Sequence, residues 1–88
     1  MKTYSLNNKT VVLDLDDDIK DASLIISNNL KVIDNGKIVW ELDEAIKNDA
    51  CVQLNIISDE EIEFITFNGL RKTLNLKTLK ITMSQITK

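Results

Sequence analysis

The stretch VIDNGKIVW, residues 32–40, contains the feature that decides the fold, an Asn35-Gly36 pair between two runs of apolar residues. A two-residue hairpin turn of type I′ needs a positive φ at both central residues, and asparagine followed by glycine adopts it readily. The second glycine of the chain also follows an asparagine, at Asn68-Gly69, within FITFNGLRKTLNL. The two pairs therefore predict two β-hairpins and an antiparallel β fold.

Short runs of β-branched and aromatic residues cover most of the chain, and no proline interrupts them. Such runs predict strands, and strands joined by short turns pair with their neighbours. We expect an all-β antiparallel meander, as a sheet or small sandwich of about seven to nine strands. Residues 43–50 favour one helical turn at most, with Asp43 as its N-cap and Glu44 in its first turn. The expected strands are 3–6, 10–15, 30–34, 37–42, 52–58, 61–67, 70–76 and 79–86.

The length of 88 residues, 43% of them apolar, predicts a single domain spanning residues 1–88. A domain of this size buries a modest core, so association with another chain is a common source of further stability. No apolar run reaches the ~20 residues of a membrane span, and residues 1–20 lack the apolar core of a signal peptide. We therefore expect a cytoplasmic protein.

The composition argues against several classes of function. A net charge of −3 disfavours nucleic-acid binding, which normally uses a basic face. There is no histidine and Cys51 is the one cysteine, so neither a Cys–His pair nor an intramolecular disulfide can form. We expect Cys51 and Trp40 to pack in the core. Without a nucleophile or a set of metal ligands, the sequence predicts a protein that is not an enzyme and holds no cofactor.

Two parts of the chain resemble each other at a spacing of about 40–45 residues, which is typical of propeller blades of four strands each. SNNLK at residues 27–31 resembles FNGLR at residues 67–71, and DNGKIVW at residues 34–40 aligns with KTLKITM at residues 77–83. The repeat predicts two similar meander units in succession.

The stretch DNGKIVW resembles the blade repeat of quinoprotein (PQQ-type) β-propellers, in which a strand and a short turn precede Gly-Lys, an apolar pair and a tryptophan. The second copy has Leu79 and Met83 in place of the glycine and the tryptophan. The resemblance covers roughly residues 24–42 and 62–83 and implies two blade-like units with exposed sheet edges. A closed propeller has at least about four blades, so the quinone cofactor and dehydrogenase activity of that family do not carry over.

The acidic stretch DLDDD at residues 14–18, with Asp21 close behind it, has three interpretations. Asp14 and Asp16 after an apolar strand resemble the nucleophile and general acid of haloacid-dehalogenase-type phosphatases, whose fold needs a parallel sheet with helices. A calcium loop would use Asp14, Asp16 and Asp18, but its glycine and its glutamate are missing here. The third interpretation is a solvated acidic loop, which can also recognise a basic partner.

We expect the function to be protein binding. A small acidic protein can dock on a larger one with a basic surface, such as a nuclease groove, as immunity proteins and phage inhibitors of host defence do. The alternative is a self-associating structural module, a homodimer formed through free sheet edges or through strand 61–67, which is apolar on both faces. The residues expected to contact the partner are Asp16, Asp17, Asp18, Asp21, Glu61 and Glu63.

Overall fold

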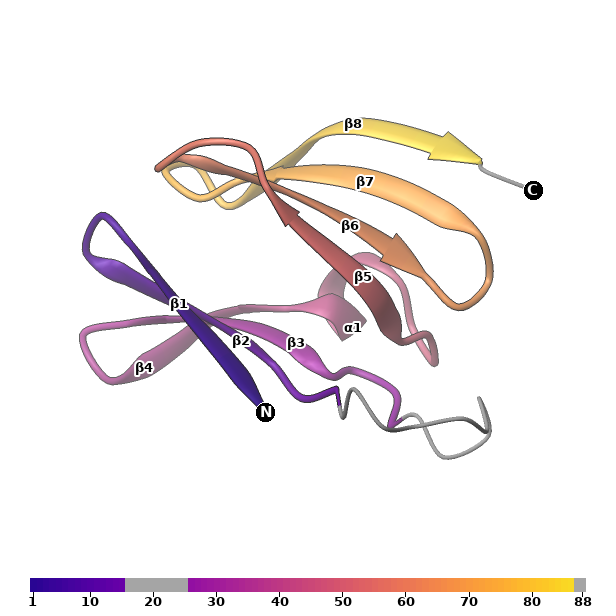
Figure 1. Ribbon diagram of the computed structural model, residues 1–88, viewed down its shortest axis with the longest axis horizontal. Coiled ribbons are helices and arrows are strands. Elements are labelled where there is room, and N and C mark those ends of the chain that lie inside the picture. Colours follow the sequence, from indigo (N-terminus) through magenta and orange to yellow (C-terminus); the bar gives the residue numbers. More distant parts are fainter. Residues whose placement is uncertain (16–25, 87–88) are drawn as a thin grey trace.

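The computed structural model describes residues 1–15 and 26–86, which form two four-stranded antiparallel sheets and one short helix (Figure 1). The strand order is β1-β2-β3-β4 in the first sheet and β5-β6-β7-β8 in the second. Each sheet is therefore a meander of consecutive strands, which confirms the predicted all-β fold of two blade-like units. The elements are β1 (Lys2–Leu6), β2 (Lys9–Leu13), β3 (Leu30–Asp34), β4 (Lys37–Glu41), α1 (Leu42–Ala45), β5 (Cys51–Ile56), β6 (Glu61–Thr66), β7 (Leu70–Asn75) and β8 (Lys80–Ile86).

The Asn35-Gly36 pair forms the predicted hairpin turn between β3 and β4. Asn35 has a φ of 53° and Gly36 a φ of 77°, the positive values that a type I′ turn requires at both positions. The turn between β1 and β2 also begins with an asparagine in the left-handed region, since Asn7 has a φ of 55°. Both hairpins of the first sheet thus depend on asparagine's tolerance of positive φ.

The turn at Asn68-Gly69 differs from the prediction. Only Gly69 of this pair has a positive φ, at 85°, and its N–H donates to the carbonyl oxygen of Thr66 at 2.9 Å. The connection from β6 to β7 therefore takes three residues, and the predicted two-residue type I′ turn is wrong here. In the turn between β7 and β8, Leu79 stands at the glycine position of the repeat and still has a φ of 58°.

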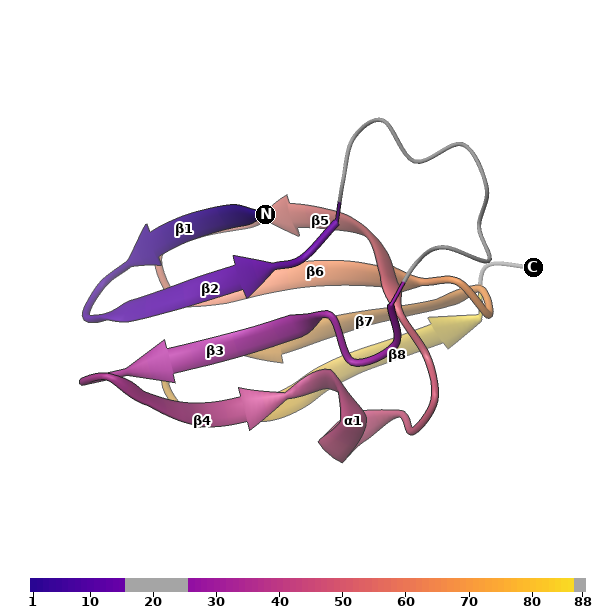
Figure 2. The same cartoon turned by 90° about the horizontal axis from the view of Figure 1, so that it is seen from below.

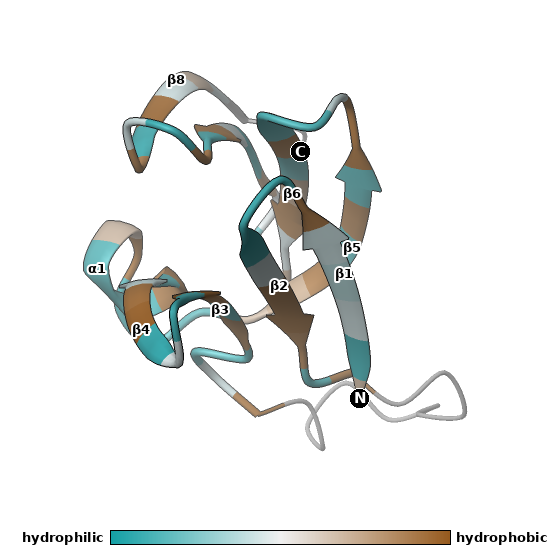
Figure 3. Cartoon of the chain, turned by 90° about the vertical axis from the view of Figure 1, so that its left-hand side faces the viewer, coloured by the Kyte–Doolittle hydropathy of each residue, from teal (hydrophilic) through white to brown (hydrophobic). Residues whose placement is uncertain are grey.

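The two sheets pack face to face with their strands in the same order, β1 over β5 through to β4 over β8 (Figure 2). They are close together at β1 and β5 and spread apart toward β4 and β8, on the side where α1 lies (Figure 3). The segment containing α1 leads from the last strand of one sheet to the first strand of the next. Propeller blades stack and connect in this way.

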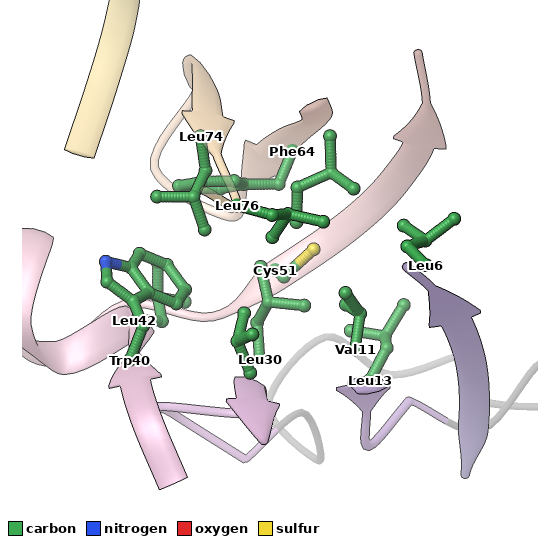
Figure 4. Packing of buried hydrophobic residues seen from close by; sticks show 12 residues of the cluster. Leu6, Val11, Leu13, Leu30, Trp40, Leu42, Cys51, Phe64, Leu74 and Leu76 are labelled. Carbon is green, nitrogen blue, oxygen red and sulfur yellow. The ribbon is translucent and has the colours of Figure 1, made fainter. Parts of the chain in front are cut away.

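The hydrophobic core fills the space between the sheets (Figure 4). Trp40 of β4 and Phe64 of β6 meet across this space, with ring centroids 5.7 Å apart and ring planes at 55°. Trp40 and Cys51 are 4% and 0% exposed, so the prediction that both pack in the core is confirmed. The buried cluster consists of Leu6, Val11, Leu13, Leu30, Val32, Trp40, Leu42, Cys51, Ile62, Phe64, Leu74 and Leu76.

The central strand β6 shows how the two faces of a sheet differ. Ile62 and Phe64 are fully buried toward the first sheet, whereas Glu61, Glu63 and Ile65 alternate with them and are half-buried on the outer face. Apolar residues on both faces are typical of a strand at the centre of a sheet, and β6 has a strand on each side. The outer face that it helps to form is mainly polar.

The helix α1 begins earlier than predicted. Glu41 is its N-cap residue and makes no side-chain capping bond, so the predicted N-cap at Asp43 is wrong. The reason is the burial of Leu42, which is 0% exposed and holds the first helical residue against the core. Asp43 lies in the first turn, where its Oδ1 accepts a hydrogen bond from the Asn48 N–H at 3.1 Å. In the described parts of the chain, no helix is long and apolar enough to cross a membrane.

Candidate functional site

The predicted acidic site lies on the connection between β2 and β3, and four of its residues fall outside the described residues: Asp16, Asp17, Asp18 and Asp21. The described ends of this connection are tied to each other. The Asp14 N–H donates to the Asn29 carbonyl oxygen at 2.9 Å, and the Asn29 side chain donates back to the Asp14 carbonyl oxygen at 3.4 Å. The connection therefore leaves and rejoins the first sheet at one point, at the end of the molecule where α1 lies (Figure 1).

Asn28 ties this connection to the segment containing α1. Its N–H donates to the Asp49 carbonyl oxygen at 2.8 Å, and its Oδ1 accepts from the Asp43 N–H at 3.0 Å. Its Nδ2 donates to the Glu41 carboxylate at 3.2 Å. The φ of 55° at Asn28 is the left-handed conformation that asparagine tolerates better than other residues with side chains. One asparagine thus fixes the return of the acidic connection against α1.

Asn29 joins the two sheets through a buried side chain that is 3% exposed. The Cys51 N–H donates to the Asn29 Oδ1 at 2.7 Å, and the Asn29 Nδ2 donates to the Cys51 carbonyl oxygen at 2.9 Å. The amide therefore satisfies both backbone groups of the first residue of β5, as a neighbouring strand would. This pair of hydrogen bonds fixes the start of the second sheet against the first.

Asp49 completes the junction and is 2% exposed. Its Oδ1 accepts from the Ala50 N–H at 2.8 Å and from the Asn68 N–H at 3.3 Å, so it holds the turn between β6 and β7. Its Oδ2 has no hydrogen-bond partner among the described residues. Neither Asn29 nor Asp49 was predicted from the sequence to have a role. The feature of the sequence that could have indicated a role for Asn29 is the pair of asparagines, Asn28 and Asn29, immediately before the buried start of β3.

Exposed carboxylates gather beside this junction. Exposed Asp14 bonds through its N–H to Asn29, and half-buried Asp43 bonds through its N–H to Asn28, with exposed Glu44 next to it in α1. We call the three residues Asp14, Asp43 and Glu44 the acidic end. Carboxylates from two separate parts of the sequence thus contribute to one end of the molecule, where their electric fields add.

The other two predicted residues lie elsewhere. Glu61 and Glu63 are half-buried on the outer face of the second sheet, whereas the acidic connection belongs to the first sheet. The Glu63 carboxylate accepts a hydrogen bond from the Asn55 Nδ2 at 3.1 Å. In the register of β6 and β7, Glu61 lies opposite Asn75 and Glu63 opposite Thr73. Glu61 and Glu63 are therefore part of a polar sheet surface.

Two observations bear on metal binding and on the reactivity of Cys51. Within residues 1–15 and 26–86, no group of three histidine, cysteine, aspartate or glutamate side chains could hold a metal ion. Burial raises the pKa of the Cys51 thiol from 9.0 to about 12, and the nearby Asp49 carboxylate adds to this effect. Since the thiolate is the nucleophile, a thiol that stays protonated in the core acts as a packing group.

The raised pKa of Cys51 predicts alkaline destabilisation. The unfolded chain releases the thiol proton near pH 9 and the folded chain only near pH 12, so unfolding releases a proton between these values. We expect the free energy of unfolding to fall there by about 1 kcal/mol per pH unit through this group. Urea titrations from pH 8 to pH 10.5 would measure it. The matched control is Cys51→Ala, whose free energy of unfolding should fall less steeply with pH. Equal slopes in the two proteins would contradict the prediction.

No protein family model matches the chain, and a search of curated proteins finds no match. Among solved structures, the chain is similar to the WD40 β-propeller domain of Doa1, with a TM-score of 0.60 and 16% sequence identity. The match covers 94% of this chain and 25% of that chain, so the protein spans about a quarter of the propeller's length. Both sheets therefore have the arrangement of β-propeller blades, and the likeness shows the fold without singling out the quinoprotein type.

Proposed function

We propose that this protein is a non-enzymatic binding module that docks on a larger protein with a basic surface, as inhibitors and immunity proteins do. The proposal rests on exposed Asp14 and Glu44 of the acidic end, and on a sequence with four further aspartates in residues 16–21. Carboxylates gathered on one surface attract a basic partner and raise its rate of association.

The construction of the acidic end also supports the proposal. Asn28 makes three hydrogen bonds that hold the return of the acidic connection against α1. Groups positioned in advance lose less conformational entropy on binding, so they contribute more to affinity.

The test is capture of a partner by the immobilised full-length protein from a lysate of the cells that carry its gene. We expect one predominant protein with a basic surface to bind at about 50 mM salt and to be released at about 500 mM, because salt screens exposed charges. Mass spectrometry would identify it, and titration calorimetry with the purified partner would measure its affinity.

Two charge-matched variants make the test specific to the acidic stretch of the sequence. Asp16→Asn with Asp18→Asn removes two carboxylates from the segment 16–21, and Glu61→Gln with Glu63→Gln removes two from the outer face of the second sheet. We expect the first variant to weaken binding at least about tenfold and the second less than about twofold, because close charge pairs dominate such interfaces. An equal loss of affinity in both variants, or the failure to capture any partner at low salt, would refute the proposal.

A second candidate function is self-association, and the free sheet edges support it. Within the described chain, β1, β4, β5 and β8 each pair with one strand only, so each has an unpaired edge. The outer faces are mainly polar, which favours association through edges over stacking of sheets. Sedimentation velocity at several concentrations tests this candidate: a mass that rises to that of a dimer supports it, and a constant monomer mass excludes it.

Two finer assignments are also proposals. We infer a cytoplasmic location, supported by a sequence whose single cysteine cannot form an intramolecular disulfide. We also retain the quinoprotein type of blade as a proposal, supported by DNGKIVW at residues 34–40. Neither assignment adds a cofactor or an activity to the proposed function.

A further inference from the structure

A cavity of about 370 Å³ lies between the two sheets at the end of the molecule opposite the acidic end. Three hairpin turns surround it: the β1–β2 turn of the first sheet and the β5–β6 and β7–β8 turns of the second, all on the left in Figure 1. Its volume is within the range of small-molecule sites in proteins. The lining residues are Leu6, Asn7, Asn8, Lys9, Glu60, Leu76 and Lys77.

The walls of this cavity are held in place by hydrogen bonds. The Asn7 Nδ2 donates to the Asp59 carbonyl oxygen at 3.0 Å and so joins the first sheet to the second. The Leu76 N–H donates to the Glu60 carbonyl oxygen at 2.6 Å, which joins the two turns of the second sheet. Leu6 and Leu76 are 9% and 2% exposed and supply an apolar floor that belongs to the core. The cavity is therefore formed before any ligand enters.

The polar groups that line the cavity are mainly hydrogen-bond donors. Lys9 is half-buried and Lys77 is exposed, and neither ammonium group has a carboxylate partner among the residues that the structure describes. Asn8 adds a side-chain amide, and Glu60 is the one carboxylate of the lining. Two cations against one anion leave the lining with net positive charge. Ammonium and amide groups next to an apolar floor bind anions more strongly than the same groups in open water.

We propose that this cavity binds a small anion with a carboxylate or phosphate group. Lys9 and Lys77 contact the charged oxygens, Asn8 donates a further hydrogen bond, and Leu6 and Leu76 pack against the rest of the ligand. Glu60 opposes a second negative charge and thereby favours ligands that also carry a hydrogen-bond donor. This site has the opposite charge to the acidic end and is separate from the proposed docking function.

The test is an NMR titration of the full chain with inorganic phosphate and, separately, with succinate, at constant ionic strength. We expect saturable shifts of the amide signals of Asn8, Leu76 and Lys77. Lys9→Gln and Lys77→Gln should each weaken binding by about two- to fivefold, which is the usual contribution of a partly exposed ion pair. Glu60→Gln should strengthen binding by a similar factor, since it removes a repulsive charge. The anion that saturates at the lower concentration identifies the ligand class.

The matched control is Lys37→Gln, which removes one positive charge from the exposed first residue of β4, outside the cavity. It should leave the affinity unchanged, and all four variants should keep the melting temperature of the parent. Shifts that rise linearly without saturation, or an equal loss in Lys37→Gln and Lys9→Gln, would overturn the proposal in favour of general attraction to surface lysines. An unchanged affinity in Glu60→Gln would contradict the role assigned to that carboxylate.

Discussion

Replacing Phe64 by alanine should lower the free energy of unfolding by about 4 kcal/mol, the usual loss for a large side chain deleted from a core. Phe64 is 0% exposed, lies in a central strand of the second sheet, and contacts Trp40 of the first. Deleting its ring leaves a cavity at the centre of the contact between the sheets. Urea unfolding followed by far-UV circular dichroism would measure the loss.

The control for this prediction is Phe67→Ala, the same deletion three residues further along. Phe67 is 56% exposed in the turn after β6, so its loss should cost less than about 1 kcal/mol. Phe64→Leu, which keeps most of the apolar volume, should cost less than about 1.5 kcal/mol and provides a folded variant if Phe64→Ala does not fold. Similar losses for Phe64→Ala and Phe67→Ala would show that the contact between the sheets is not the main source of stability.

Replacing Asn29 by alanine should cost about 3 kcal/mol. The variant leaves the Cys51 N–H and carbonyl oxygen buried without their partners, and each unsatisfied group costs about 1–3 kcal/mol. For a domain of this size, a loss of 1 kcal/mol lowers the melting temperature by roughly 4–8 °C, so a fall of at least 12 °C is expected. Thermal unfolding followed by the fluorescence of Trp40, which is buried in the folded state, would measure it.

Asn55→Ala is the matched control for Asn29→Ala. Asn55 is exposed in β5 and its side chain bonds to the Glu63 carboxylate at the surface, so its loss should cost less than about 0.5 kcal/mol. If Asn29→Ala unfolds at the same temperature as Asn55→Ala, the side-chain bridge between the sheets contributes nothing measurable. In that case, hydrogen exchange at the Cys51 amide should be as slow in Asn29→Ala as in the parent protein. The exchange can be measured on the same samples.

The turn residues allowed much of the fold to be predicted from sequence, and the one error among them has a physical explanation. Asn35-Gly36 forms the expected type I′ turn because both residues adopt positive φ. At Asn68-Gly69 the same dipeptide takes another turn, because Asp49 accepts the Asn68 N–H and Thr66 accepts the Gly69 N–H. A contact with a residue 19 positions earlier in the sequence thus replaced a local preference.

The sequence indicated which kinds of residue the acidic site contains, but it did not indicate which residues lie together in either candidate site. The aspartates of segment 14–18 are evident in the sequence, but the sequence does not reveal that Asn28, at the end of the same connection, bonds to Glu41 and Asp43. The cavity at the opposite end was not predicted at all. Lys9 and Lys77 are far apart in the sequence, and they line one cavity because the turns of the two sheets meet there.

By itself, the sequence determined that this protein is an antiparallel β meander of two similar units. Alternation of apolar residues and the conformational preferences of asparagine and glycine act over a few residues and can be recognised locally. Only the tertiary structure decided that Asn29 satisfies Cys51, 22 residues away, and which charged groups share a surface. Those outcomes depend on how the sheets stack, because burial and hydrogen bonding between distant residues exist only once the two meanders pack together.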